Sequence, residues 1–101
     1  MKTIIQEGDG HVLVTLDGEL DTASAAVTEQ ELQPVMMRDN CDAVLDCSRL
    51  LYISSSGLRL LLALNKRYRQ YGHRVKVKGL SDDLLKVFKM TGFDHLFDIE
   101  P

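Results

Sequence analysis

The sequence is poor in cysteine: two of its 101 residues are cysteines, and tryptophan is absent. This scarcity excludes a disulfide-stapled secreted scaffold. Cys41 and Cys47 do not have the spacing of a zinc ribbon or a redox pair, so we expect both thiols to be reduced, with Cys47 in the core. His11, His73 and His95 are scattered without ligand spacing. We therefore expect no metal site.

Long apolar runs are also missing. In the second half the longest extends from Leu60 to Leu64, far short of a membrane span, and the first residues lack the apolar stretch of a secretory signal. We therefore predict a cytoplasmic protein with no membrane partner. The length suits a single domain over residues 1–101, and a hydrophobic content of 45% is sufficient for one core.

Charge is distributed unevenly along the chain. Residues 1–50 carry ten acidic and three basic side chains, whereas residues 51–101 carry five acidic and nine basic ones. A basic half raises the question of nucleic-acid binding. However, no aromatic residues interleave with these charges, and the isoelectric point is about 5.5. We expect Lys66, Arg67 and Arg69 to be solvated and predict no nucleic-acid partner.

Hydrophobic patterns predict the order β-β-α-β-α-β-α. Strands are expected at residues 4–5, 11–16, 43–45 and 74–78, the first two joined in a hairpin by a turn at residues 8–10. Residues 46–53 are expected to carry the chain out of the sheet. The pattern predicts an α/β or α+β fold: a four- to five-stranded mixed sheet with its helices mainly on one side and residues 43–45 in the central strand.

Three helices are expected between these strands. The first is capped by Asp21 or Thr22, with Pro34 near its end, and the third opens at Ser81 and ends at Gly92. The second follows Ser54–Ser56 and ends at Gly72. The expected inward residues of the first two are Ala23, Ala26, Val27, Leu32 and Val35, and then Leu58, Leu61, Leu62, Asn65, Tyr68 and Tyr71.

The three serines followed by Gly57 are the most informative feature. Free N–H groups and the positive end of the helix dipole favour an anion at a helix start. A serine there can cap the helix, and a phosphate would add about −1.5 to −2 charges that this end tolerates. Taken alone, such serines are more often plain caps. Gly57 would let the backbone of another protein approach closely.

Motifs of enzymes are absent. The sequence has no Gly-x-Ser-x-Gly, no phosphate-binding loop, and no histidine or acid placed to activate a serine. The paired acids Asp82 and Asp83 are explained by their place at a helix start. We therefore expect a protein that is not an enzyme and has no catalytic residues.

Three segments together resemble the STAS family, which takes its name from sulfate transporters and anti-sigma factor antagonists. The segment from Asp46 to Leu58 resembles the family signature that opens a helix with Ser-Ser-Gly-Leu. Gly18-Glu19-Leu20-Asp21 resembles its second signature. Met90-Thr91-Gly92-Phe93 with Leu96-Phe97 resembles its C-terminal close. The resemblance covers nearly the whole chain in order and at family spacing.

The resemblance implies a single STAS-type domain with a phosphoacceptor at Ser55. Many members carry Asp where this chain has Ser54, so a local negative charge is missing here. We expect Ser55 to be exposed at the helix mouth and Ser56 to spend its hydroxyl on the backbone. The implied contact surface comprises Asp21, Thr22, Ser54, Ser55, Ser56, Gly57, Leu58 and Arg59.

The implied function is that of an anti-sigma factor antagonist, a kinase substrate that needs no cofactor of its own. Its unphosphorylated form would bind an anti-sigma factor that is also a serine kinase of the GHKL type, and thereby release sigma factor. Phosphorylation of Ser55 would switch binding off, and a serine phosphatase would restore it. The alternative is a scaffold module of a stressosome-like or lipid-transport complex. Because the chain begins at Met1 and ends soon after its last predicted helix, we expect a free-standing protein.

Overall fold

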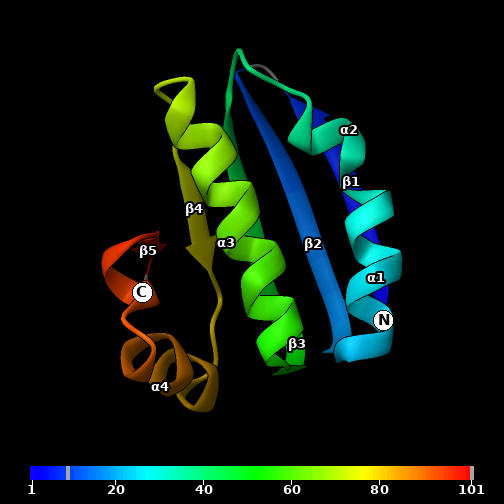
Figure 1. Ribbon diagram of the computed structural model, residues 1–101, viewed down its shortest axis with the longest axis vertical. Helices are drawn as coiled ribbons and strands as arrows, with labels where there is room; N and C mark the ends of the chain where they lie inside the picture. Colours follow the sequence, from blue (N-terminus) through cyan, green and yellow to red (C-terminus); the bar gives the residue numbers. More distant parts are fainter. Residues whose placement is uncertain (9, 101) are drawn as a thin grey trace.

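The computed structural model describes residues 1–8 and 10–100. The predicted turn at 8–10 includes Asp9, which lies outside the described residues. Along the chain the elements are β1 Lys2–Gly8, β2 His11–Leu20, α1 Thr22–Glu31, α2 Gln33–Met36, β3 Asp42–Ile53, α3 Ser55–Gln70, β4 Val75–Lys78, α4 Asp82–Met90, the 3-10 helix η1 Phe93–His95 and β5 Asp98–Glu100 (Figure 1).

The strands of the described chain form one sheet in the order β1-β2-β3-β4-β5. The pairing of β1 with β2 is antiparallel, and every other pairing is parallel. Ala43 pairs with both Val12 and Val75, so residues 43–45 lie in the central strand. The helices lie on one face of the sheet (Figure 1). The predicted fold class, the hairpin and the central strand are confirmed.

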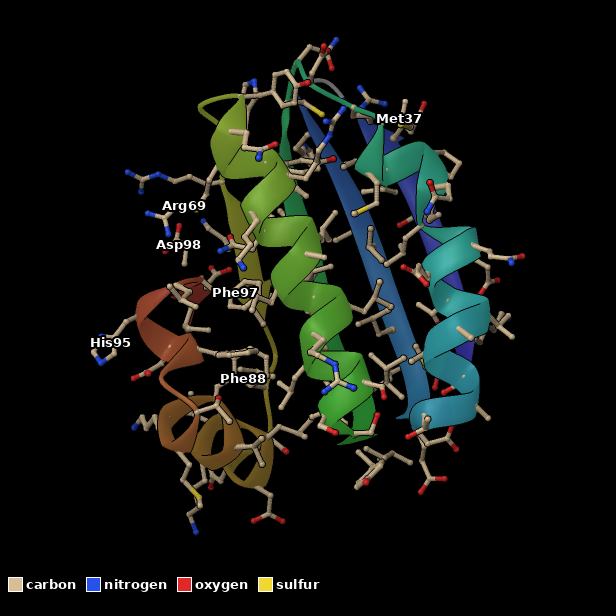
Figure 2. The ribbon with its side chains drawn as sticks, viewed as in Figure 1. Met37, Arg69, Phe88, His95, Phe97 and Asp98 are labelled. Atoms are coloured by element: carbon tan, nitrogen blue, oxygen red, sulfur yellow. The ribbon has the colours of Figure 1, made fainter. Side chains whose placement is uncertain are left out.

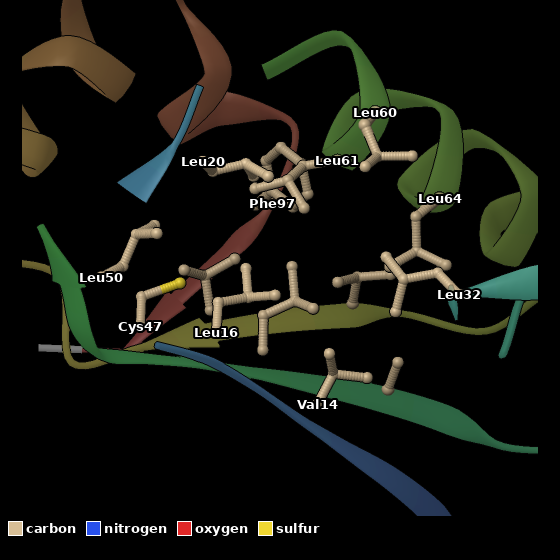
Figure 3. Packing of buried hydrophobic residues seen from close by; sticks show 14 of the residues in the cluster. Val14, Leu16, Leu20, Leu32, Cys47, Leu50, Leu60, Leu61, Leu64 and Phe97 are labelled. Carbon is tan, nitrogen blue, oxygen red and sulfur yellow. The ribbon is translucent and has the colours of Figure 1, made fainter. Parts of the chain in front are cut away.

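The core lies between α3 and the sheet. Strand side chains alternate, so that Val14 and Leu16 on β2 face the helices and are fully buried. Leu61 and Leu64 on α3 point onto them (Figure 3). The expected face of α3 missed Leu60 and Leu64 and wrongly included Tyr71, whose side chain is exposed. The buried face of α3 differs from the predicted one because α3 also packs against α1 and α2. The hydrophobic pattern of α3 alone does not reveal this packing.

Of the predicted inward residues of the first helix, Leu32 and Val35 are confirmed, but α1 itself turns a different face inward from the one predicted. Ala25, Thr28, Leu32 and Val35 are buried, whereas Ala23 and Ala26 are exposed and Val27 is 61% exposed. Pro34 divides the predicted helix in two. It stands in the first turn of a separate helix, α2, and the chain bends at Leu32 between the two. The two short helices therefore do not share one continuous stripe.

Strand β3 continues to Ile53, so the prediction that residues 46–53 leave the sheet is wrong. Two register shifts place extra residues on β3 opposite β2. Leu50, between the two shifts, and Ile53, after them, point inward, whereas Leu51 and Tyr52 are exposed. Bulges of this kind break the two-residue alternation on which a sequence-based strand assignment depends. Strand β2 likewise runs to Leu20.

Asp46 and Ser48 stabilise the first of these bulges. The Asp46 carboxylate accepts hydrogen bonds from the Ser48 hydroxyl at 2.7 Å and from its backbone N–H at 3.1 Å. The bond from the hydroxyl holds the pKa of Asp46 below its ordinary value. Gly79 lies directly against this bulge, since a Cβ there would stand 2.8 Å from the Ser48 nitrogen. Asp46 and Ser48, at the start of the segment that resembles the family signature, therefore have a structural role.

The C-terminal segment packs around α4. Ser81 caps α4 as predicted, and Gly92 follows its end with φ of 77°. Phe88 and Phe97 point toward each other beside the sheet, with ring centroids 5.7 Å apart (Figure 2). The short strand β5 then pairs with β4. It is the fifth strand of a sheet for which four to five were predicted, and the sequence did not locate it.

Two expectations about individual side chains have different outcomes. Both cysteines are free and buried, and burial raises the pKa of the Cys47 thiol to about 12. Arg67 is not simply solvated as predicted, because its Nε donates to the Met36 carbonyl at 3.0 Å and its guanidinium lies over the Tyr71 ring.

In the part of the chain that is described, no helix has the length and apolar character needed to span a membrane.

Candidate functional site

The predicted contact residues gather where β2 and β3 end and α1 and α3 begin. Leu20 and Ile53 are register partners at the ends of these strands. The Ser54 N–H donates to the Leu20 carbonyl at 2.9 Å, which ties the two strand exits together. Asp21 and Ser54 follow these exits directly. Parallel strands thus bring two separate sequence signatures to one edge of the sheet, at the lower end of the view in Figure 1.

Ser54 is the cap of α3. Its hydroxyl accepts a hydrogen bond from the Gly57 N–H at 3.1 Å, and its backbone is extended, as is usual for a cap. Only 8% of Ser54 is exposed. The sequence left open which of the three serines caps the helix, and the structure assigns the cap to Ser54, one residue before Ser55. The Ser54 hydroxyl is therefore buried and engaged.

The other two serines occupy the first two positions of α3. Ser55 is exposed, and in the described parts of the chain its hydroxyl has no hydrogen-bond partner. Ser56 is half-buried, and its hydroxyl accepts a bond from Arg59 Nη2 at 3.3 Å. The prediction that Ser56 bonds to the backbone is wrong because Arg59 lies one turn further along the helix. Among the three serines, Ser55 has the hydroxyl that is both exposed and unengaged.

Gly57 serves the packing within the protein. It is buried, and a Cβ added to it would lie 2.8 Å from the Leu20 side chain and 2.9 Å from that of Ile53. From the sequence, Gly57 was expected to let the backbone of another protein approach closely. In the structure it instead lets α3 approach the protein's own core. Leu58 is buried as well. These two predicted contact residues hold the first turn of α3 in place beneath the exposed serine.

A groove between α1 and α3 adjoins the serines. It has a volume of about 330 Å³ and contains three of the predicted contact residues, Thr22, Ser56 and Arg59. The sequence analysis did not find its other lining residues, which are Ala25, Ala26, Glu29, Leu60 and Ala63. No local signal marks them, because the groove arises from the packing of α1 against α3.

Two exposed apolar residues beside the site were also missed. Leu51 is 77% exposed and Tyr52 is 50% exposed, just before Ser54. Their position follows from the bulges of β3, which turn both outward. Exposed aromatic and aliphatic side chains next to a polar site are typical anchors of protein–protein contacts. An unexpected apolar pair near a strand end is the signal that could have identified them.

The charges at the two helix starts differ. At α1, the Asp21 carboxylate accepts bonds from the Ser24 N–H at 2.8 Å and from the Ser24 hydroxyl at 2.9 Å. The backbone bond and then the hydroxyl bond lower the pKa of Asp21. The first turn of α3 carries no acid. Arg59 has no ion pair in residues 1–8 and 10–100, so the surroundings of Ser55 hold an unpaired cation.

Comparison with known proteins extends over nearly the whole chain. The family model described as "Mlab, STAS domain" matches residues 4–99. BtrV of Bordetella bronchiseptica, a provisionally named anti-sigma factor antagonist, is 33% identical over 99 residues, which cover 98% of this chain and 85% of BtrV. The anti-sigma-B factor antagonist of Bacillus subtilis is 26% identical over 95 residues, covering 94% of this chain and 86% of the relative.

A solved structure agrees with these sequence relatives. The crystal structure of an anti-sigma factor antagonist from Mycobacterium paratuberculosis superimposes with a TM-score of 0.82 at 27% identity. The superposition covers 99% of this chain and 85% of that one. The two proteins thus share one fold over nearly the whole of this chain.

Proposed function

Since this chain belongs to the STAS domain family, we propose that it is an anti-sigma factor antagonist that is switched by phosphorylation of Ser55. The named antagonists that match nearly its full length support the first part. One observation carries the second part: Ser55 is exposed and its hydroxyl is unengaged, whereas Ser54 caps α3 and Ser56 bonds to Arg59. An acceptor must enter the active site of a kinase, and Ser55 meets that requirement.

The protein acts as a substrate and a binding partner, not as an enzyme. The partner is an anti-sigma factor that is itself a serine kinase of the GHKL type. In the cytoplasm, the unphosphorylated protein occupies this partner and frees sigma factor. The kinase then transfers the γ-phosphoryl group of ATP to Ser55 Oγ, the hydroxyl loses its proton, and ADP leaves. A serine phosphatase hydrolyses the ester and restores the binding form.

The contact surface surrounds the acceptor. Asp21, Thr22, Ser56 and Arg59 lie around Ser55 at the starts of α1 and α3, and Leu51 and Tyr52 add apolar anchors. Ser54, Gly57 and Leu58 support this surface from beneath. A phosphate at its centre would have to be desolvated on binding and would repel acidic groups of the partner. We expect phosphorylation to weaken binding about a hundredfold, which corresponds to about 3 kcal/mol.

The fold can accept the phosphate without rearrangement. The first N–H groups of a helix have no partners within the helix, and its dipole favours negative charge. Ser55 stands at the first position of α3, and its side chain points to solvent. The change in affinity therefore arises at the contact surface, with the sheet and core unchanged.

Mass spectrometry and calorimetry test the proposal. Wild type and the single variants Ser55→Ala and Ser56→Ala are incubated with a GHKL-type anti-sigma factor of the same genome and ATP. We expect the mass of one phosphate group on wild type and Ser56→Ala, and none on Ser55→Ala. Ser55→Ala should keep its affinity for the partner after the incubation, and Ser55→Asp should bind poorly.

Two outcomes would contradict the proposal. Full phosphorylation of Ser55→Ala would show that the acceptor lies elsewhere. Equal partner affinity of phosphorylated and unphosphorylated wild type would remove the switch and leave the scaffold function. Circular dichroism of each variant serves as the control for folding.

A further inference from the structure

Arg59 stands one turn beyond the proposed acceptor on the same helix. We propose that Arg59 pairs within the molecule with the phosphate carried by Ser55, and so stabilises the phosphorylated form and draws the guanidinium away from the α1–α3 groove. This inference rests on the proposed function for the choice of Ser55 as the acceptor. It adds a residue that regulates the same site.

The geometry of α3 places the two side chains together. Ser55 and Arg59 are four residues apart in one helix, so they lie on the same face. A long side chain in a helix leans toward the helix N-terminus and covers the preceding turn. The observed contact has this direction, since Arg59 Nη2 lies 3.3 Å from the hydroxyl of Ser56, the neighbour of Ser55. A phosphate on Ser55 would extend outward over that turn.

The guanidinium of Arg59 is available for an anion. Arg38 and Arg49 have carboxylate partners at 2.8 and 3.7 Å, whereas Arg59 has none in the described residues. Its bond to Ser56 is long and goes to a neutral hydroxyl. Bonds between guanidinium and phosphate are shorter, often bidentate and about twice as strong as neutral ones. It is therefore favourable for Arg59 to exchange its bond to the Ser56 hydroxyl for a bond to the phosphate on Ser55.

The surrounding charges favour the same pairing. The first turn of α3 has no acid that would compete for the guanidinium or repel the phosphate. Glu29 lines the groove from α1 but forms no ion pair with Arg59. Asp21 is occupied by the Ser24 N–H and hydroxyl. Because Arg59 itself lines the groove, its movement to the phosphate would change that surface as well as the charge of Ser55.

Phosphorus NMR of a protein with phosphoserine installed at position 55 during translation tests this pairing without any kinase. The second pKa of the phosphate is measured in wild type, Arg59→Gln and Arg59→Lys. We expect the pKa to rise by about 0.4 to 0.8 in Arg59→Gln, since one charge near 4 Å in water changes a pKa by about 0.8 and salt screening reduces this effect. Arg59→Lys should raise the phosphate pKa less, since lysine keeps the positive charge and loses only the bidentate geometry of the guanidinium.

Lys66→Gln is the matched control, because Lys66 is an exposed cation on the same helix, seven residues further on. It should leave the phosphate pKa within about 0.1 of wild type, since exposed charges a Debye length away are screened. An unchanged pKa in Arg59→Gln, or an equal rise in Lys66→Gln, would overturn the inference. The titration gives its answer whether or not a kinase selects Ser55, so its failure is distinguishable from failure of the proposed function.

Discussion

The first turns of α3 and α4 have the same cap and differ at the positions that follow it. In α3 the Ser54 hydroxyl accepts from the Gly57 N–H at 3.1 Å, and in α4 the Ser81 hydroxyl accepts from the Leu84 N–H at 3.2 Å. Both helices follow a parallel strand and begin at the same edge of the sheet. Two comparable helix starts therefore exist within one molecule.

The next two residues separate them. In α4 they are Asp82 and Asp83, which place carboxylates beside the free N–H groups. In α3 they are Ser55 and Ser56, and no acid is present. A phosphate on Ser55 would put its charge where α4 already holds that of Asp82. The comparison indicates that α3 is the helix start at which a negative charge can be added and removed, whereas that of α4 is permanent.

The third position also differs. Gly57 is pressed against Leu20 and Ile53, whereas the corresponding residue of α4, Leu84, is a buried side chain that anchors its helix. The start of α3 is thus packed through a residue without a side chain, and the start of α4 through a buried leucine side chain. Three sets of substitutions test this comparison of helix starts.

The largest effects are expected at this third position. Leu84→Ala should lower the free energy of unfolding by about 2–5 kcal/mol, because it leaves a cavity. Gly57→Ala should lower it by about 1–3 kcal/mol through overpacking against Leu20 and Ile53. Urea denaturation measures both. A more stable Gly57→Ala protein would show that the gain in helix propensity, about 1 kcal/mol, exceeds the contact cost, and would contradict the close packing of α3.

Cap removal should affect the two helices equally. Ser54→Ala and Ser81→Ala should each reduce stability by about 1 kcal/mol, since each loses one bond to an N–H of the first turn. Ser55→Ala is the matched control and should stay within about 0.5 kcal/mol of wild type, because its hydroxyl has no partner. Thermal and urea unfolding report these differences. If Ser55→Ala were as destabilising as Ser54→Ala, the assignment of the cap would be wrong.

A smaller effect is expected at the start of α1, which shows how first-turn donors act on an anion. NMR titration should give Asp21 a pKa below its ordinary 3.8. Ser24→Ala should raise it toward that value, because the hydroxyl bond is lost and the backbone bond remains. Since the native pKa is the lower one, Asp21 contributes to stability above pH 3.8, and the contribution is lost as the pH falls through the native pKa. An Asp21 pKa at or above 3.8 in wild type would contradict the stabilisation of anions at these helix starts.

The sequence by itself determined the order of elements, the central strand at residues 43–45 and the place of the serines at a helix start. These follow from local causes: apolar runs, turn and cap residues, and the signature around Gly57. The caps at Ser81 and Asp21 and the helix stop at Gly92 were likewise within reach, because a cap depends on neighbours three residues away.

Only the tertiary structure decided which serine is buried, which face of α1 turns inward and where the groove lies. The bulges that keep residues 46–53 in the sheet depend on pairing with β2, and they move the cap to Ser54 and turn Leu51 and Tyr52 outward. The groove at Arg59 depends on the packing of α1 against α3. Both arise from contacts between segments distant in sequence, whose energies no local pattern contains.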